Sequence, residues 1–301
     1  MSNFERSDSQ SYVKDQLTSP LQNLTGEFWV KFWGVRGLTP TPNSHTCRYG
    51  SNTACVEIYV GGQHLIFDGG TGLRVLGKTL QKQEDPIQAH LFFTNSQSNR
   101  IQGFPFFAPA FVTDNCFHVY GTAASNGASI KQCLCDQMLQ PHFPYPLQVM
   151  QSELLFHHLT PGNALEIGEV KITTALINKH QRSIGYRMTW GDYSVAYTTD
   201  LHKTIEIQDQ DQILPLIQDV DLLIANATYT PPAGNSHEYA ELLWKTPVNL
   251  AQMGNVKRLV ISQHHPDDDD DFLDHIQNHV KSAFPNVLLA SEGMMICVGD
   301  R

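Results

Sequence analysis

The sequence lacks features that would place it among membrane or nucleic-acid-binding proteins. None of its apolar runs approaches the roughly 18 uninterrupted residues that a membrane-spanning helix needs, so we expect no membrane association. Basic residues are few, because 20 Lys and Arg stand against 30 Asp and Glu and give a net charge of −10. A non-specific nucleic-acid-binding surface needs the opposite balance. We therefore expect neither a membrane nor a nucleic acid as partner.

Cysteine is also scarce. The 301 residues contain six cysteines, too few for a disulfide framework, at positions Cys47, Cys55, Cys116, Cys133, Cys135 and Cys297. The first residues, MSNFERSDSQSYVKDQL, are polar and lack the apolar core of a signal peptide. These two features predict free thiols and a cytoplasmic location.

What remains is the composition of a globular protein with an excess of histidine. Hydrophobic residues make up 41% and charged residues 17% of the chain, which is too apolar for disorder. Fourteen histidines suggest a metal site. Most of them are scattered along the chain, however, as His64, His90, His118 and His142 illustrate. We therefore expect most histidines to be surface or core residues rather than metal ligands.

The order of patterns along the chain predicts an α/β sandwich. Residues 1–25, rich in Ser, Gln and Asn, are expected to form a flexible arm, and residues 26–301 a single domain. Short β-rich runs begin at Glu27, and the spacing of leucines predicts a helix over 71–83. Similar alternation in the second half predicts two β-then-α halves. Together they favour two sheets with helices on both outer sides, an αββα arrangement.

Three further elements are predicted from local signals. Residues 124–140 are expected to form a helix that ends before a cluster of prolines. The last helix is expected to begin at Pro266, because proline suits a first helical turn and the aspartates at 267–271 suit the positive end of a helix dipole. The final segment, VLLASEGMMICV, is expected to be one strand.

Several segments together resemble a known family. KFWGVRGLTPTP, RYGSNTACVEI and LIFDGGTGLRVLG are followed by IQGFPFFAPAF, IGYRM, YTTD, DLLIANATYT and ASEGMMI. In this order they resemble the metallo-β-lactamase-fold hydrolases, in particular the branch that contains ribonuclease Z and the cyclic phosphodiesterases. The resemblance extends from about residue 29 to residue 298. It implies the metallo-β-lactamase fold, an αββα sandwich, and a site for one or two zinc or manganese ions.

The main metal-binding motif of that family is degenerate in this chain. The family's His-x-His-x-Asp-His follows a buried strand that ends in Thr, and here the flanking segments FFT and IQGFPFF are kept. The four ligand positions are occupied by Asn95, Gln97, Asn99 and Arg100. Amide oxygens bind zinc poorly, and a guanidinium has no acceptor. By resemblance, the turn has lost its metal site.

The remaining ligand positions implied by the resemblance are mixed. The next histidine of the family falls on Lys179, with His180 beside it. The bridging aspartate is kept as Asp200. The last histidine corresponds either to Gln263, and is then lost, or to His264, and is then kept.

These changes suggest that protein charge has replaced metal charge. Asp200 stays anionic, while Arg100 and Lys179 bring cations to former ligand positions. Because a buried carboxylate needs a counter-charge, we expect Arg100, with Lys179, to pair with Asp200. Asp68 normally orients a metal histidine in the family, and here we expect it to bind backbone amides of the turn at 69–72.

The sequence thus favours a pseudoenzyme, a binding or regulatory protein that uses the old cleft or a dimer surface. Its partner would be an anionic small molecule or a protein, and the resemblance implies a homodimer. No cofactor is expected. The alternative is a zinc- or manganese-dependent phosphodiester or ester hydrolase, with a rebuilt site around Asp200, His180 and His264.

Overall fold

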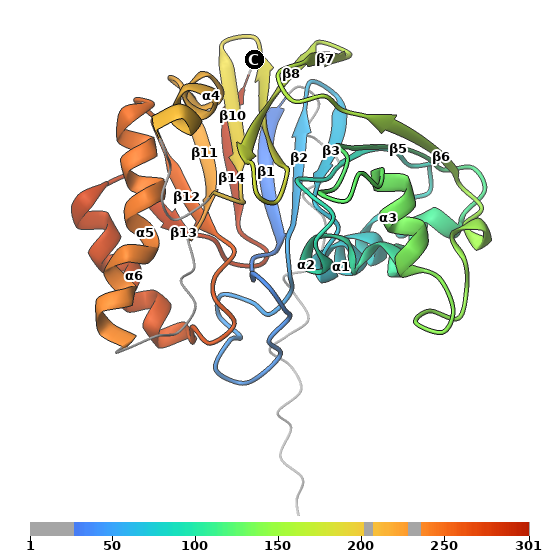
Figure 1. Ribbon diagram of the computed structural model, residues 1–301, viewed down its shortest axis with the longest axis horizontal. Coiled ribbons are helices and arrows are strands. Elements are labelled where there is room, and N and C mark those ends of the chain that lie inside the picture. The colour runs from blue at the N-terminus through green and yellow to red at the C-terminus, as the bar shows by residue number, and fades with distance from the viewer. Residues whose placement is uncertain (1–26, 202–206, 228–235, 301) are drawn as a thin grey trace, which may run out of the picture.

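The computed structural model describes residues 27–201, 207–227 and 236–300, so the arm expected at 1–25 lies outside the described residues. The described chain forms two seven-stranded sheets that face each other, with helices on both outer sides (Figure 1). This is the αββα sandwich that the sequence predicts. No helix in these ranges is both long and apolar enough to cross a membrane.

The first sheet comes mainly from the N-terminal half. Its strands, in spatial order, are β14 (Met295–Asp300), β1 (Glu27–Gly34), β2 (Cys55–Val60), β3 (Gln63–Phe67), β4 (Gln88–Phe92), β5 (Cys116–Gly121) and β6 (Glu153–His158). Strands β3 to β6 are parallel, and β14, β1, β2 and β3 pair antiparallel. Helices α1 (Thr71–Leu80), α2 (Ser98–Ile101) and α3 (Ile130–Gln137) belong to this half.

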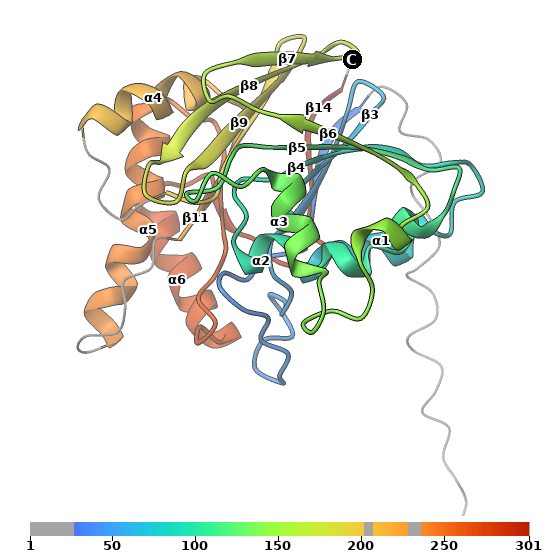
Figure 2. The same ribbon diagram turned by 45° about the vertical axis from the view of Figure 1, so that its right-hand side comes forward.

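The second sheet repeats the same plan. Its strands, in spatial order, are β13 (Val287–Leu289), β12 (Leu259–Ser262), β11 (Leu222–Asn226), β10 (Tyr193–Thr198), β9 (Ser183–Trp190), β8 (Val170–Asn178) and β7 (Ala164–Ile167). Strands β10 to β13 are parallel, and β7 to β10 pair antiparallel. Helices α4 (Ile207–Ile217), α5 (Ser236–Met253) and α6 (Asp270–Ala283) cover its outer face, as Figure 2 shows.

Alternation along the strands divides the side chains among three apolar layers. In β1, Phe28, Val30 and Phe32 point between the sheets, where they pack with residues such as Tyr186 and Tyr197 of the second sheet. The intervening residues of β1 point to the outer face, because neighbours on a strand face opposite sides. Two further cores lie between each sheet and its own helices.

Two predicted helices begin later in the structure than the sequence suggests. Helix α3 covers only Ile130–Gln137, because Ser129 caps it by accepting a hydrogen bond from the backbone of Gln132. Helix α6 begins at Asp270 rather than at Pro266, since Asp269 is the residue whose side chain caps the helix.

The expected final strand is two strands in different sheets. β13 pairs with β12 and β14 pairs with β1. Gly293 lies between them with φ of 82°, a left-handed conformation that glycine adopts without strain. The chain turns there and passes from the second sheet to the first.

Candidate functional site

The segment that would carry the metal motif is held tightly against the turn after β3. The backbone N–H of Gly69 donates to the carbonyl of Arg100 at 2.6 Å, and that of Gly103 donates to the carbonyl of Gly69 at 2.9 Å. A Cβ atom on Gly103 would lie 1.8 Å from the carbonyl oxygen of Gly70. Only glycine permits this approach, and it positions the short helix α2 that carries Arg100.

Arg100 is buried, and the shorter of its ion pairs is with Asp68. Its Nη1 donates to Oδ2 of Asp68, in a contact between two side chains that are 3% and 0% exposed. The same guanidinium donates to the side-chain and backbone oxygens of Thr199, in the turn after β10. Asp68 comes from the first sheet and Thr199 from the second. The arginine therefore joins the carboxyl ends of the two sheets.

Asp68 is surrounded by further donors. Its Oδ1 accepts from the backbone N–H of Thr94 at 2.8 Å, and its Oδ2 accepts from the hydroxyl groups of Thr94 at 3.0 Å and Tyr197 at 2.9 Å. The expectation that Asp68 binds amides of the 69–72 turn was wrong. Those amides donate instead to the carbonyls of Arg100, Ala54 and Thr53 and to the side-chain hydroxyl of Thr53, so the carboxylate is left to face Arg100.

Asp200 completes the cluster at the same edge. Its Oδ1 lies 3.9 Å from Nη2 of Arg100, so the ion pair expected between Asp200 and Arg100 is present. It is longer than the ion pair of Arg100 with Asp68. Oδ2 accepts from Nδ2 of Asn95 at 3.0 Å and from the hydroxyl of Ser183. The side chain of Asp200 is 19% exposed, so solvent reaches this carboxylate, whereas the carboxylate of Asp68 is buried.

The charge distribution explains why the cluster is stable. Burial by itself would lower the pKa of Arg100, but the charges of Asp68 and then Asp200 raise that pKa above its ordinary value. Burial and the Asp68 charge raise the pKa of Tyr197, so that its hydroxyl stays a neutral donor. One buried cation is thus held between two carboxylates.

The residues at the motif positions do not fit a metal ion. The amide oxygen of Asn95 accepts the backbone N–H of Gln97 at 2.9 Å, so its nitrogen, not its oxygen, faces Asp200. Asn99 is buried, Gln97 is half-buried, and Arg100 places positive charge between the carboxylates. Zinc and manganese sites need several lone-pair donors around one point. Among the described residues, no group of three or more His, Cys, Asp and Glu side chains has that arrangement.

The two candidates for the last metal ligand lie differently. Gln263 follows β12 with φ of 59°, and its buried amide has no hydrogen-bond partner within the described chain. His264 is buried as well, but its Nε2 lies 2.8 Å from the carbonyl oxygen of Ala290 and its ring packs edge-on against Tyr49. His264 is therefore held as a core residue.

Lys179 and His180 lie on the exposed turn between β8 and β9. The backbone N–H of His180 donates to the side chain of Asn178. Ser183, which the sequence interpretation did not consider, donates its hydroxyl to Asp200. A small hydroxyl residue gives no sequence signal of such a role.

Three histidines that are far apart in the sequence lie side by side in the first sheet. His90 of β4, His118 of β5 and His157 of β6 stack across neighbouring parallel strands, with ring centroids 4.8 and 5.2 Å apart. Nδ1 of His118 lies 2.9 Å from Nε2 of His157. Burial, then the neighbouring histidines, lowers the pKa of His90 to about 4 and lowers that of His157. The three rings thus form one stacked cluster across the sheet.

Acid is expected to destabilise the protein through His264. Burial lowers its pKa to about 4, whereas the pKa in the unfolded chain is about 6.5. The unfolded state therefore binds the proton first, and stability falls as pH drops from about 6.5 to 4, by about 3 kcal/mol for this one group. Urea unfolding across this range should show a smaller loss for His264→Gln. His142→Gln, at an exposed histidine, is the control.

Comparison with known proteins agrees with the fold. Neither a family model nor a curated protein sequence matches the chain. Solved structures do match: YhfI, a metallo-β-lactamase fold protein from Bacillus subtilis, has a TM-score of 0.62 at 18% identity over 90% of this chain and 99% of its own. The short form of human tRNase Z gives 0.61 at 15% over 90% and 99%. A diphosphatase of the PhnP family gives 0.59 at 14% over 90% and 100%.

The class of protein follows from these observations. Two facing mixed sheets, helices on both outer sides and the similarity to those structures define a metallo-β-lactamase fold. In the position where the sequence resemblance places the metal motif, this chain carries an arginine between two aspartates.

Proposed function

We propose that this chain is a pseudoenzyme: a metallo-β-lactamase-fold protein that has exchanged metal charge for protein charge and works by binding rather than hydrolysis. One observation carries the proposal, the buried ion pair of Arg100 with Asp68, which Asp200 extends. A metal ion and a guanidinium held in this way would compete for the same carboxylates. The arginine stabilises the fold and at the same time removes the position for an ion.

Polar groups at the former metal edge support binding. Gln97 is partly exposed there and offers a neutral donor, and the buried amide of Gln263 has unsatisfied hydrogen-bonding capacity. A buried polar group without a partner is costly, and a ligand that satisfies it is favoured. We propose an anionic small molecule or an acidic partner segment as the ligand class, with a dimer surface as the second place where a partner binds.

A metal and activity measurement tests this function. The purified chain is incubated with zinc and manganese, desalted, analysed by inductively coupled plasma mass spectrometry, and assayed with bis(p-nitrophenyl) phosphate. We expect less than stoichiometric metal and no turnover above that of Asp200→Ala. Stoichiometric metal with turnover that Asp200→Ala abolishes would contradict the proposal.

A variant with the motif rebuilt serves as the positive control. It carries Asn95→His, Gln97→His, Asn99→Asp, Arg100→His and Gln263→His. Because the framework around the turn is intact, we expect this variant to retain zinc under conditions in which the natural chain does not. Equal retention by both would show that Arg100 does not keep metal out.

The alternative, a hydrolase rebuilt around Asp200, His180 and His264, receives less support from the geometry. The Nε2 atom of His264 is occupied by the carbonyl of Ala290, and His180 lies on an exposed turn. The same assay decides it: turnover that disappears in both His180→Ala and Asp200→Ala would establish this alternative.

A further inference from the structure

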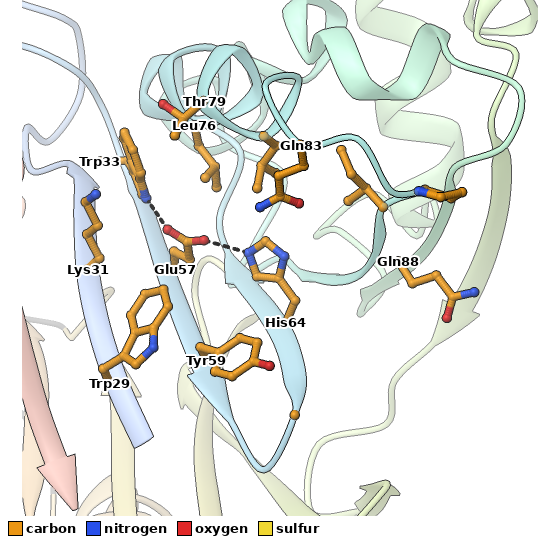
Figure 3. A pocket seen from close by; sticks show the side chains of 14 residues that line it. Trp29, Lys31, Trp33, Glu57, Tyr59, His64, Leu76, Thr79, Gln83 and Gln88 are labelled. Carbon is orange, nitrogen blue, oxygen red and sulfur yellow. Dashed lines mark hydrogen bonds and ion pairs between the residues drawn. The ribbon is translucent and has the colours of Figure 1, made fainter. Parts of the chain in front are cut away.

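A pocket of about 450 Å³ lies on the outer face of the first sheet, at the opposite edge from Asp68. It is bounded by β1, β2 and β3 below and by the C-terminal half of α1 above (Figure 3). His64, which lines it, precedes Asp68 by four residues of extended strand, or about 13 Å. Its volume is in the range of small-molecule sites. The cluster around Arg100 does not use it.

The floor of the pocket is aromatic. Trp29, Lys31 and Trp33 are the outward-facing residues of β1, two residues apart, and Tyr59 is the cross-strand partner of Trp29. The rings of Trp29 and Tyr59 are stacked, with centroids 5.6 Å apart and planes 14° from parallel. Leu76, Leu80 and Ile87 add aliphatic side chains to the lining. A flat ring packs well against an aromatic floor of this kind.

Glu57 is a buried carboxylate, and both of its oxygens have partners within the pocket. Its Oε2 accepts from Nε1 of Trp33 at 2.6 Å, and its Oε1 lies 2.7 Å from Nε2 of His64 (Figure 3). Burial would raise the pKa of Glu57, but His64, Trp33 and the charge of Lys31 outweigh it and lower that pKa. The carboxylate thus serves to hold the indole of Trp33 and the ring of His64 in place.

Two donors are left over. The ammonium of Lys31 lies 4.3 Å from the centroid of the Trp33 ring, and no carboxylate forms an ion pair with it among the described residues. The indole N–H of Trp29 has no acceptor within the described chain, but it is buried and points away from the Lys31 ammonium (Figure 3). The half-buried cation beside the aromatic floor therefore favours an acceptor that carries negative charge.

We propose that this pocket binds a small planar aromatic carboxylate, with its ring against the aromatic floor and its carboxylate on Lys31. The site is separate from the one that the pseudoenzyme proposal concerns. It requires no metal and no change in the ion pair of Arg100.

Three probes with the same ring test the charge preference: indole-3-acetate, indole and tryptamine, each titrated into the full chain by isothermal titration calorimetry. Indole-3-acetate is expected to bind at least about tenfold more tightly than tryptamine, because one charge-assisted hydrogen bond corresponds to about that factor. Neutral indole is expected to fall between them. Equal affinity for the anion and the cation, or no binding by any of the three, would overturn the proposal.

Variants locate the site. Lys31→Met is expected to weaken the binding of indole-3-acetate about tenfold while leaving the binding of indole unaffected. Lys171→Met removes an exposed lysine of the second sheet and is the matched control. Unchanged binding in Lys31→Met, with the thermal unfolding of all variants alike, would also overturn the proposal. Such a failure would not affect the pseudoenzyme proposal, which the metal measurement tests separately.

Discussion

Replacement of Arg100 by leucine is expected to lower the free energy of unfolding by about 3 to 5 kcal/mol, the largest single effect that we foresee at this site. The substitution leaves the carboxylate of Asp68 buried and 0% exposed without its cation, and removal of one partner of a buried ion pair has costs of this size. It also removes the hydrogen bonds that tie α2 to Thr199 of the second sheet. Urea unfolding, followed by circular dichroism, measures the difference.

Two further variants show whether the cost comes from the charge. Arg74→Leu removes an exposed arginine of α1 and is expected to change stability by no more than about 0.5 kcal/mol. Adding Asp68→Asn to Arg100→Leu removes the uncompensated carboxylate, and the double variant should regain about 1 kcal/mol or more. If the double variant were as unstable as the sum of the single variants, Arg100 would not act as the counter-charge of Asp68.

Gly103→Ala is the second substitution for which we expect a large effect. Its Cβ would stand 1.8 Å from the carbonyl oxygen of Gly70 and 2.6 Å from the carbonyl carbon. Because these are backbone atoms, the segment 95–103 must move away from the turn after β3. The hydrogen bonds of Gly69 with Gly103 and Arg100 would then break. We expect a loss of about 3 kcal/mol or more, measured as the shift in the urea midpoint, or failure to fold.

Gly77→Ala is the matched control for that substitution. Its Cβ would meet side-chain atoms of Phe107 and Pro109 at 3.0 Å, where a few tenths of an ångström of adjustment suffice. Alanine in the middle of α1 also gains about 1 kcal/mol of helix propensity over glycine. The two variants should differ by at least about 2 kcal/mol. A Gly103→Ala variant as stable as Gly77→Ala would mean that the close approach does not hold the motif segment.

The order of segments was enough to predict the sandwich, because each strand pattern reports which of its faces is buried. The leucine spacing in 71–83 gave a helix that the structure places at Thr71–Leu80. Helix starts were less certain: five consecutive aspartates and a proline offer several possible caps, and Asp269 is the one whose side chain reaches the backbone of Phe272. The segment predicted as one final strand is divided at Gly293. The apolar pattern of the sequence gives no sign of the turn at this residue.

At the site, the sequence identified the changed positions but not all of their partners. The pairing of Arg100 with Asp200 follows from the presence of a cation and an anion at former ligand positions, and it is confirmed. The shorter pair with Asp68 was missed, because Asp68 was expected to bind the backbone of its own turn. Distances between loops that are 32 residues apart depend on how the sheets face each other, and no local pattern contains them.

By itself, the sequence determined the chemistry that is present: amides and a guanidinium where the family resemblance has metal ligands, a net charge of −10, and strands that alternate between two faces. The tertiary structure decided which of these groups meet. It set one arginine between two aspartates from different sheets, placed His264 in a core, and gathered Trp29, Lys31, Glu57 and His64 around one pocket. The physical reason is that residue types fix what a group can donate or accept, whereas burial and counter-charges depend on contacts between distant segments.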